Sequence, residues 1–168
     1  MYTILSRIVK VVIGIALLAM IAGRVNAQGL VTERNLSMGM AKTIAEAAQA
    51  ECRAMGYHTT VAVVDRAGQL LILLRDEKAG PHTIEMARRK AYTARVFRRP
   101  TAEFQKRTMP DSAIAGQRDL TDILALSGGV PINVGDDTIG AVASAGSTLE
   151  SDDACAKAGI AKVADLLK

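Results

Sequence analysis

Two histidines and two cysteines carry the most specific chemistry in this chain, and their spacing limits what they can do. Cys52 and Cys155 stand too far apart in the sequence to form a metal site of the CxxC type. A Ser-His-Asp set, a P-loop, a GxGxxG motif after a strand and an HExxH motif are all absent. The sequence therefore does not assemble a conventional catalytic centre.

The two histidines differ in their local setting. His82 follows Gly80 and Pro81 at the start of a predicted helix, where the helix dipole favours a neutral imidazole with a nitrogen free to ligate a metal. The alternative for His82 is a solvent-exposed or capping histidine. His58 precedes the first predicted strand, beside Tyr57, and we interpret it as a loop residue with a weaker claim to be a ligand.

The two cysteines allow two interpretations. If the first and last helices pack side by side, a Cys52–Cys155 disulfide would close a long loop and stabilise the fold by about 3 to 5 kcal/mol in the chain-entropy model. Otherwise they are two buried, unpaired thiols. The spacing does not choose between these, although disulfides persist in the compartments that receive exported proteins.

The N-terminus has the pattern of an export signal. Arg7 and Lys10 precede the 13-residue uncharged run Val11–Gly23, and Val25-Asn26-Ala27 provides small residues where a signal peptidase cleaves. The run is shorter than the ~20 residues that a membrane-spanning helix needs. We therefore expect residues 1–27 to be removed as a signal peptide.

The mature chain would then begin at Gln28 and form one domain over residues 28–168. This interpretation predicts a periplasmic or secreted protein with no stable membrane insertion after processing.

The charge balance changes when the signal is set aside. The whole chain has 21 basic and 17 acidic residues, but three basic residues and no acid lie in residues 1–27, which leaves 18 against 17. No aromatic stacking series accompanies the remaining local basic cluster, so we interpret it as a solvated helix face and expect no nucleic-acid partner. The cluster comprises Arg88, Arg89, Lys90, Arg95, Arg98, Arg99, Lys106 and Arg107.

Hydrophobic periodicity predicts the elements that would position these residues. Helical spacing predicts a first helix over about 33–55 that stops at Gly56. Two β-rich runs, Thr59–Asp65 and Gln69–Arg75, form a predicted hairpin in which Gly68 takes the positive φ of the turn. Asp65 is expected to close that turn by bonding its own backbone.

The second half of the chain alternates in the same way. Helical spacing predicts a helix over Pro81–Phe97 that Pro100 ends, a short helix from the N-cap Thr101, and a loop over 108–119. Three further strands are predicted at 123–126, 130–134 and 138–143, and a last helix at 151–167. Because hairpins dominate, we expect an α/β (α+β) fold with a central, mainly antiparallel five-stranded sheet flanked by helices.

Four segments of this chain resemble the GlcG/HbpS-like group, which includes the C-terminal domain of PduO-type proteins. They are Val63–Leu70 (VVDRAGQL), Lys90–Ala94 (KAYTA), Pro100-Thr101 and Gly128–Ile132 (GGVPI). The resemblance extends from Leu36 to Lys168. It implies a profilin-like layer structure, assembly into homo-oligomers, a small-molecule ligand, and haem as the cofactor that several members bind or process.

If the ligand is haem, the resemblance directs attention to particular side chains. Haem iron is most often held by His, Cys, Met or Tyr, which makes His82 the predicted metal ligand. Basic side chains would pair with propionates or another carboxylate, and a glycine-rich turn would shape a pocket wall with its N–H groups. Salt bridges to neighbouring acids, and a turn that the sheet itself requires, are the alternatives. The predicted cofactor-binding residues are His82, Arg75, Lys90, Gly128, Gly129 and Pro131.

Two departures from the family pattern weaken this expectation. The glycine-rich turn of the G-V-S-G-G kind is replaced by Ala143-Ser144-Ala145-Gly146-Ser147, which keeps one glycine of three. Ligand contacts that need close backbone approach are therefore in doubt there. The R-x-D-G-A segment reads Arg75-Asp76-Glu77-Lys78-Ala79, which keeps the arginine and loses the glycine.

The sequence supports three functional hypotheses. The first is an exported haem-binding or small-molecule-binding oligomeric module. The second is an enzyme that degrades haem or acts on a small organic acid, and the third is a structural or regulatory oligomer with a vestigial pocket. Because no catalytic motif is present, the residues alone leave open whether the protein is an enzyme.

Overall fold

A computed structural model describes residue 29 and residues 31–168 of the chain, and Arg34–Lys168 form one compact unit. The predicted signal peptide at residues 1–27 lies outside the described residues. Among the residues that are described, no helix has the length and apolar character that crossing a membrane requires.

The described part of the chain contains one antiparallel sheet of four strands in the order β2-β1-β4-β3. The strands are β1 (Thr60–Val64), β2 (Leu70–Arg75), β3 (Gly129–Val134) and β4 (Asp137–Ala145). The predicted hairpin is confirmed, since Gly68 joins β1 to β2 with a φ of 80° and Asp65 Oδ1 accepts a hydrogen bond from the Gln69 N–H at 2.9 Å. The antiparallel character of the predicted fold class is therefore confirmed.

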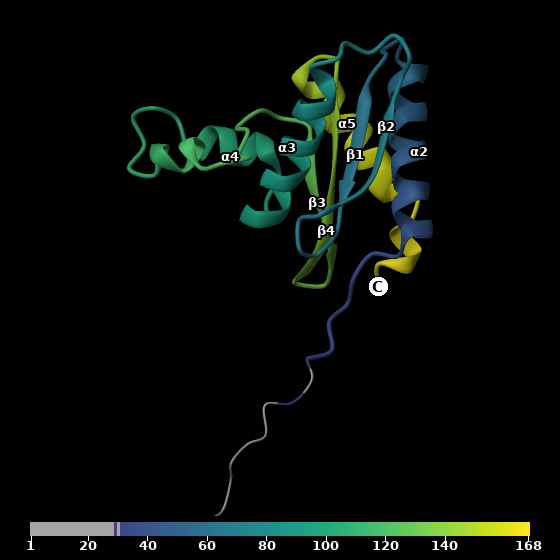
Figure 1. Cartoon of the computed structure of the whole chain (residues 1–168), viewed down its shortest axis with the longest axis horizontal. Helices are drawn as coiled ribbons and strands as arrows, with labels where there is room; N and C mark the ends of the chain where they lie inside the picture. The colour runs from purple at the N-terminus through teal and green to yellow at the C-terminus, as the bar shows by residue number, and fades with distance from the viewer. Residues whose placement is uncertain (1–28, 30) are drawn as a thin grey trace, which may run out of the picture. The chain divides into compact units, whose positions relative to one another are not determined.

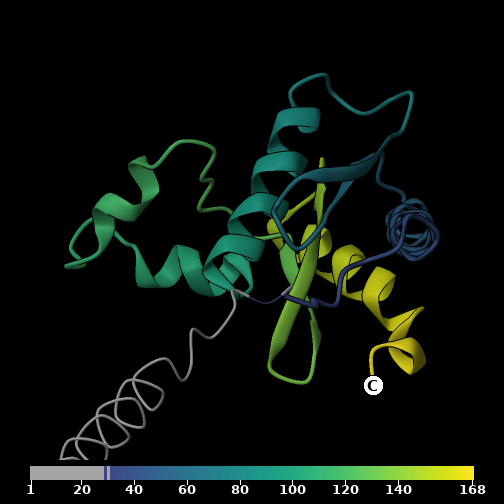
Figure 2. The ribbon, with the colours of Figure 1, turned by 60° about the horizontal axis from the view of Figure 1, so that its bottom comes forward.

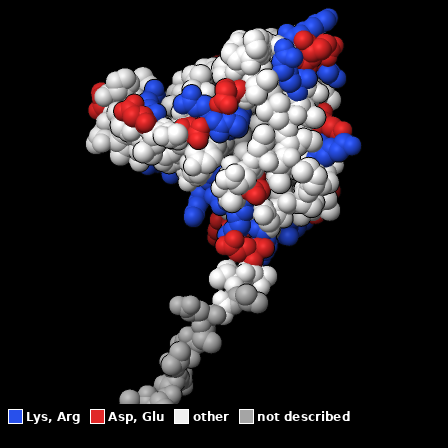
Figure 3. All heavy atoms as spheres, viewed as in Figure 1, with Lys and Arg blue, Asp and Glu red and all other residues white. Residues whose placement is uncertain are grey.

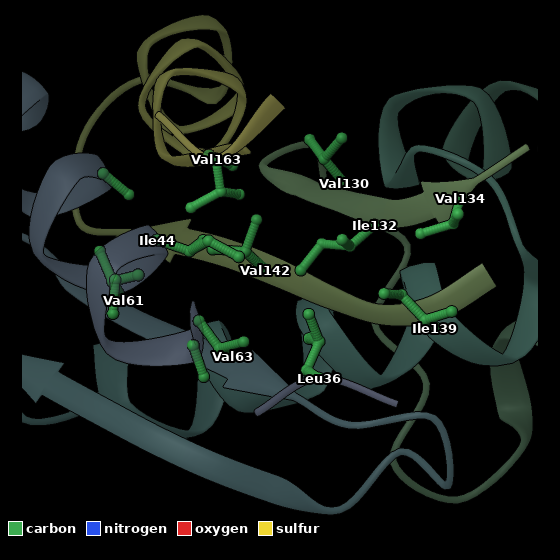
Figure 4. Close-up of a cluster of buried hydrophobic side chains, with 14 residues drawn as sticks. Leu36, Ile44, Val61, Val63, Val130, Ile132, Val134, Ile139, Val142 and Val163 are labelled. Carbon is green, nitrogen blue, oxygen red and sulfur yellow. The ribbon is translucent and has the colours of Figure 1, made fainter. Parts of the chain in front are cut away.

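Helices cover both faces of this sheet (Figures 1 and 2). Helix α2 (Met38–Ala54) and helix α5 (Leu149–Ala161) pack side by side on one face, and helix α3 (Thr83–Phe97) packs on the other. The core under α2 and α5 is made mainly of branched aliphatic side chains, including Ile44, Val61 and Val142 (Figure 4). The core under α3 is built mainly from alanines of α3, β1 and β4, so α3 lies close against the strands.

The helix bounds differ from the predictions, and side-chain caps set where α2 and α5 begin. Helix α2 begins at Met38 rather than near residue 33, because the Ser37 hydroxyl caps it by accepting from the Met40 N–H at 3.2 Å. Helix α5 begins at Leu149 behind the cap Thr148 and ends at Ala161, and a separate 3₁₀ turn, η2 (Ala164–Leu166), follows it.

The predicted fifth strand at residues 123–126 is wrong. This segment instead docks on α3, where the Leu124 N–H donates to Thr93 Oγ1 at 2.9 Å and Arg89 Nη2 donates to the Ile123 carbonyl at 2.6 Å. Ile123 is buried in that contact. Side chains of α3 satisfy backbone groups of this apolar run, so it does not pair with a strand.

Residues 100–126 form an arm that projects from the layers (Figure 2). It contains helix α4 (Thr101–Arg107) and the 3₁₀ turn η1 (Ala115–Asp119), which lies at the end of the predicted loop. Pro100, not Thr101, occupies the N-cap position of α4, because the Thr101 hydroxyl instead accepts the Gly129 N–H at 2.8 Å. The arm is anchored to α3 by Arg88, which pairs with Asp122 at 2.6 Å.

Cys52 of α2 and Cys155 of α5 form a disulfide, with their Cα atoms 5.5 Å apart and 103 positions apart in sequence. The bond joins the two helices that cover one face of the sheet. Of the two interpretations that the sequence allowed for the cysteines, the structure shows the bridge.

Candidate functional site

The strand register brings three distant segments to one end of the sheet. Thr60, at the start of β1, pairs with Arg75 at the end of β2 and with Ala145 at the end of β4. The first turn of α3 joins them, since Thr83 Oγ1 lies 2.6 Å from Thr60 Oγ1. We call the region of His58, Arg75, His82 and Gly146 the histidine end of the sheet; β1 begins there, and Figure 1 shows α3 beginning at the same end.

His82, the predicted metal ligand, lies exposed at the N-cap position of α3. Its side chain makes no capping hydrogen bond. The ring lies over Gly80, where an added Cβ would come within 2.7 Å of His82 Cε1. Within residues 31–168 no hydrogen-bond acceptor orients either ring nitrogen of His82, so its ring is accessible but not held in one direction.

His58 is held much more firmly. Its Nδ1 lies 3.0 Å from Oδ1 of Asp76, which is almost completely buried, while 43% of the His58 side chain is exposed. Asp76 also accepts from the Lys78 N–H at 3.0 Å and from Arg53 Nε at 2.8 Å. The Lys78 N–H and the Arg53 guanidinium hold the pKa of the Asp76 carboxyl far below its usual range, so the residue is ionised at neutral pH.

The His58–Asp76 pair was missed by sequence reasoning, which treated His58 as a loop residue. The two residues are 18 positions apart and are brought together only because β1 and β2 form a hairpin. An acid just after the second strand, opposite a histidine just before the first, is the signal that could have indicated it.

Arg75 ends β2 at the surface, and its Nη2 donates a hydrogen bond to the Ala79 carbonyl. This bond closes the short loop that leads to α3. Neither of the predicted partners, a ligand carboxylate or a neighbouring acid, accounts for this contact.

Lys90, by contrast, is completely buried between α3 and the sheet. Its Nζ lies 2.7 Å from Asp152 Oδ2 and donates to the Ser144 carbonyl at 3.1 Å. Asp152 in turn accepts from the Ser147 hydroxyl at 2.7 Å. Lys90 was predicted to contact a ligand, and the basic cluster that contains it was interpreted as a solvated helix face. The structure instead places Lys90 in an internal ion pair with Asp152.

The glycine-rich segment at the start of β3 packs directly over this ion pair. Gly128 has a φ of 117°, and an added Cβ would come within 2.7 Å of Asp152 Cβ and 3.0 Å of Lys90 Nζ. A Cβ on Gly129 would come within 2.5 Å of the Lys90 carbonyl. Both glycines are buried, and they are required here by close packing against α3 and α5.

Pro131 is buried within β3, opposite Ala141 of β4. Because β3 pairs with a strand on one side only among the described residues, a residue without an N–H is tolerated there. The structure therefore divides the predicted site residues into two groups. Arg75 and His82 share the histidine end with His58, whereas Lys90, Gly128, Gly129 and Pro131 lie in the interior.

Ser144 and Ser147, in the turn that departs from the family's glycine-rich pattern, have a clear structural role. Ser147 donates to Asp152 from both its hydroxyl and its N–H, at 2.7 and 3.2 Å, and Ser144 lies between Asp152 and the disulfide at 3.4 Å from each. The turn after β4 is thus tied to the Lys90–Asp152 pair.

Two cavities of the described structure are lined by none of His58, Arg75, His82 and Gly146. One, of about 490 Å³, is lined by residues that include Met40, Ile139 and Leu167, and the other, of about 650 Å³, lies between α2 and α5. Within the described residues, no group of three or more His, Cys, Asp or Glu side chains could hold a bare metal ion. A metal at the histidine end would therefore need ligands of its own, as haem iron has.

Comparison with known proteins identifies the family of this chain. A family model described as "Haem degrading protein HbpS-like" matches residues 36–161. The chain belongs to this family. The protein GlcG of Escherichia coli K12 is 33% identical over 107 residues, which covers 64% of this HbpS-like chain and 78% of GlcG.

Solved structures agree with this assignment. A double mutant of HbpS from Streptomyces reticuli is 34% identical, covers 83% of this HbpS-like chain and 96% of its own, and superposes with a TM-score of 0.76. A PduOC:heme complex has the same fold, with a TM-score of 0.72 at 24% identity over 76% of this chain and 94% of that one. The resemblance first noticed in the four sequence motifs is confirmed.

Proposed function

We propose that this HbpS-like chain is an exported, oligomeric module that binds haem. The observation that carries the proposal is the family match over residues 36–161, whose description names haem. The haem complex of PduOC adds that a chain with this fold can hold the cofactor. The profilin-like classification implied by the resemblance stays a prediction.

The residues at the histidine end fit haem in their chemistry. Imidazole is a common iron ligand, and both histidines of the chain are exposed there. A macrocycle also needs apolar neighbours, and an exposed apolar side chain stands near each histidine in sequence: Met55 after α2 and Ile84 in the first turn of α3 are each 39% exposed. Bound haem would supply an iron centre for ligand or electron chemistry.

We predict that the purified protein, titrated with hemin, gives a saturable Soret band. The reason is that a fixed protein ligand to iron and apolar contacts with the porphyrin both favour the bound form. The matched control is the variant His58→Ala/His82→Ala, which should lose the ligand-dependent part of the band. No saturable band with the wild-type protein would reject haem binding.

The same titration separates binding from degradation, the second candidate function, which the family description favours. On addition of a reductant and oxygen, a binding module keeps its Soret band, whereas a haem-degrading enzyme loses it as the macrocycle opens.

We further predict that protein isolated from its native host begins at Gln28 and contains more than one copy of the chain. The apolar edge strand β2 supports assembly, because Leu70 is 45% exposed and no strand pairs with the outer side of β2 within the described residues. Native mass spectrometry measures both properties together. A monomer, or a chain that retains Met1–Ala27, would contradict the corresponding part of the proposal.

A further inference from the structure

The two histidines at the histidine end differ in whether the fold orients their rings. Protein histidines that bind metals usually donate their second ring N–H to a carboxylate, carbonyl or water, which fixes the tautomer and direction of the ring. His58 has such a partner in Asp76, at 3.0 Å, whereas His82 makes no side-chain hydrogen bond at its cap position.

The Asp76 carboxylate determines which ring nitrogen of His58 carries the hydrogen. Asp76 is buried and pairs with the Arg53 guanidinium at 2.8 Å, so its carboxylate accepts hydrogen bonds, and Nδ1 of His58 is the donor in their 3.0 Å contact. In the neutral ring the lone pair then resides on Nε2. The side chain is 43% exposed, so the fold presents an oriented imidazole to the surface.

The Asp76 carboxylate is itself fixed from other directions. Its Oδ2 accepts from Arg53 Nε at 2.8 Å, and its Oδ1 accepts from the Lys78 N–H at 3.0 Å. In Figure 3, basic and acidic side chains gather together at the end of the molecule where α2 ends. Because Arg53 and Lys78 hold Asp76 without help from the histidine, the carboxylate does not depend on His58 for a partner.

We propose that His58, rather than His82, ligates haem iron through Nε2, with Asp76 as the positioning residue that orients the ring. This inference rests on the proposed function, since it requires that the protein bind haem. A purely structural role, in which His58 only joins the start of β1 to the end of β2, is the competing explanation.

The test is a hemin titration of four proteins, followed by absorbance and electron paramagnetic resonance. His58→Ala should weaken binding by roughly tenfold or more and change the iron spin state, while His82→Ala should resemble wild type. Asp76→Asn should weaken binding by about 10 to 100-fold, as expected for loss of the group that orients a ligand. Exogenous imidazole should restore the wild-type spectrum to His58→Ala, which a structural role would not produce.

The outcomes separate the inference from the proposed function. If wild type binds hemin and His58→Ala binds it with the same affinity and spectrum, the assignment of His58 is wrong and haem binding stands. If His82→Ala alone loses the iron ligand, His82 is the ligand and the inference fails. If wild type shows no saturable binding, both proposals fail. Because Asp76 keeps Arg53 and Lys78 as partners in His58→Ala, this variant should fold, and circular dichroism checks that it does.

Discussion

Asp152→Ala is expected to lower the free energy of unfolding by about 3 to 5 kcal/mol. The substitution would leave the Lys90 ammonium buried without its counter-ion, 2.7 Å from where the carboxylate had been, and an unpaired buried charge is costly. The Ser144 carbonyl alone remains to accept from Nζ. Urea unfolding of the oxidised protein, followed by far-ultraviolet circular dichroism, measures the change.

Two controls show whether the charge is responsible for that loss. Asp165→Ala removes an acid of a solvent-exposed pair with Lys168 and should cost less than about 1 kcal/mol. Lys90→Met/Asp152→Ala should be more stable than Asp152→Ala, because no charge is then left buried. An Asp152→Ala variant as stable as Asp165→Ala would refute the role given to the ion pair.

Loss of the Cys52–Cys155 disulfide should be comparably destabilising, at about 4 to 5 kcal/mol. The bond closes a loop of roughly one hundred residues that contains the whole sheet, and in the chain-entropy model a loop of this length restricts the unfolded chain by that amount. Unfolding of Cys52→Ala/Cys155→Ala, compared with oxidised wild type in the same urea series, gives the value.

Reduction offers a matched test of the same bond. A thiol reductant should destabilise wild type and leave the double alanine variant unchanged, since the variant has no cysteine. Equal stability of wild type with and without reductant would show that the bond contributes little. A large effect would make the fold depend on an oxidising compartment, which is where the proposed export would deliver it.

Short-range patterns of the chain were sufficient for much of the fold. The hairpin around Gly68 and the Asp65 turn were predicted because both depend on residues within a few positions of each other. The bounds of helix α3 were predicted to within two residues at each end, because helical spacing is also a pattern of nearby residues. The strand count was wrong because a short apolar run such as residues 123–126 can form either a strand or a loop that packs against the core, and its pattern does not distinguish the two.

The candidate site was predicted less completely. The predicted site residues Arg75 and His82 lie at one end of the sheet, but Lys90, predicted to contact ligand and included in a basic cluster interpreted as solvated, is completely buried. Its burial depends on Asp152, 62 positions away, whose approach no local pattern reveals. The same is true of Asp76, which gives His58 its orientation.

Local patterns of residues were enough to indicate the family, the hairpin and the helices that flank the sheet, because motif order and hydrophobic period are properties of neighbouring residues. The packed fold was needed to show that Lys90 is an internal charge, that Cys52 is bonded to Cys155, and that His58 has a carboxylate partner. Each of these depends on a contact between residues far apart in the chain. Such a contact forms, and contributes to stability, only when the helices and the sheet have packed together.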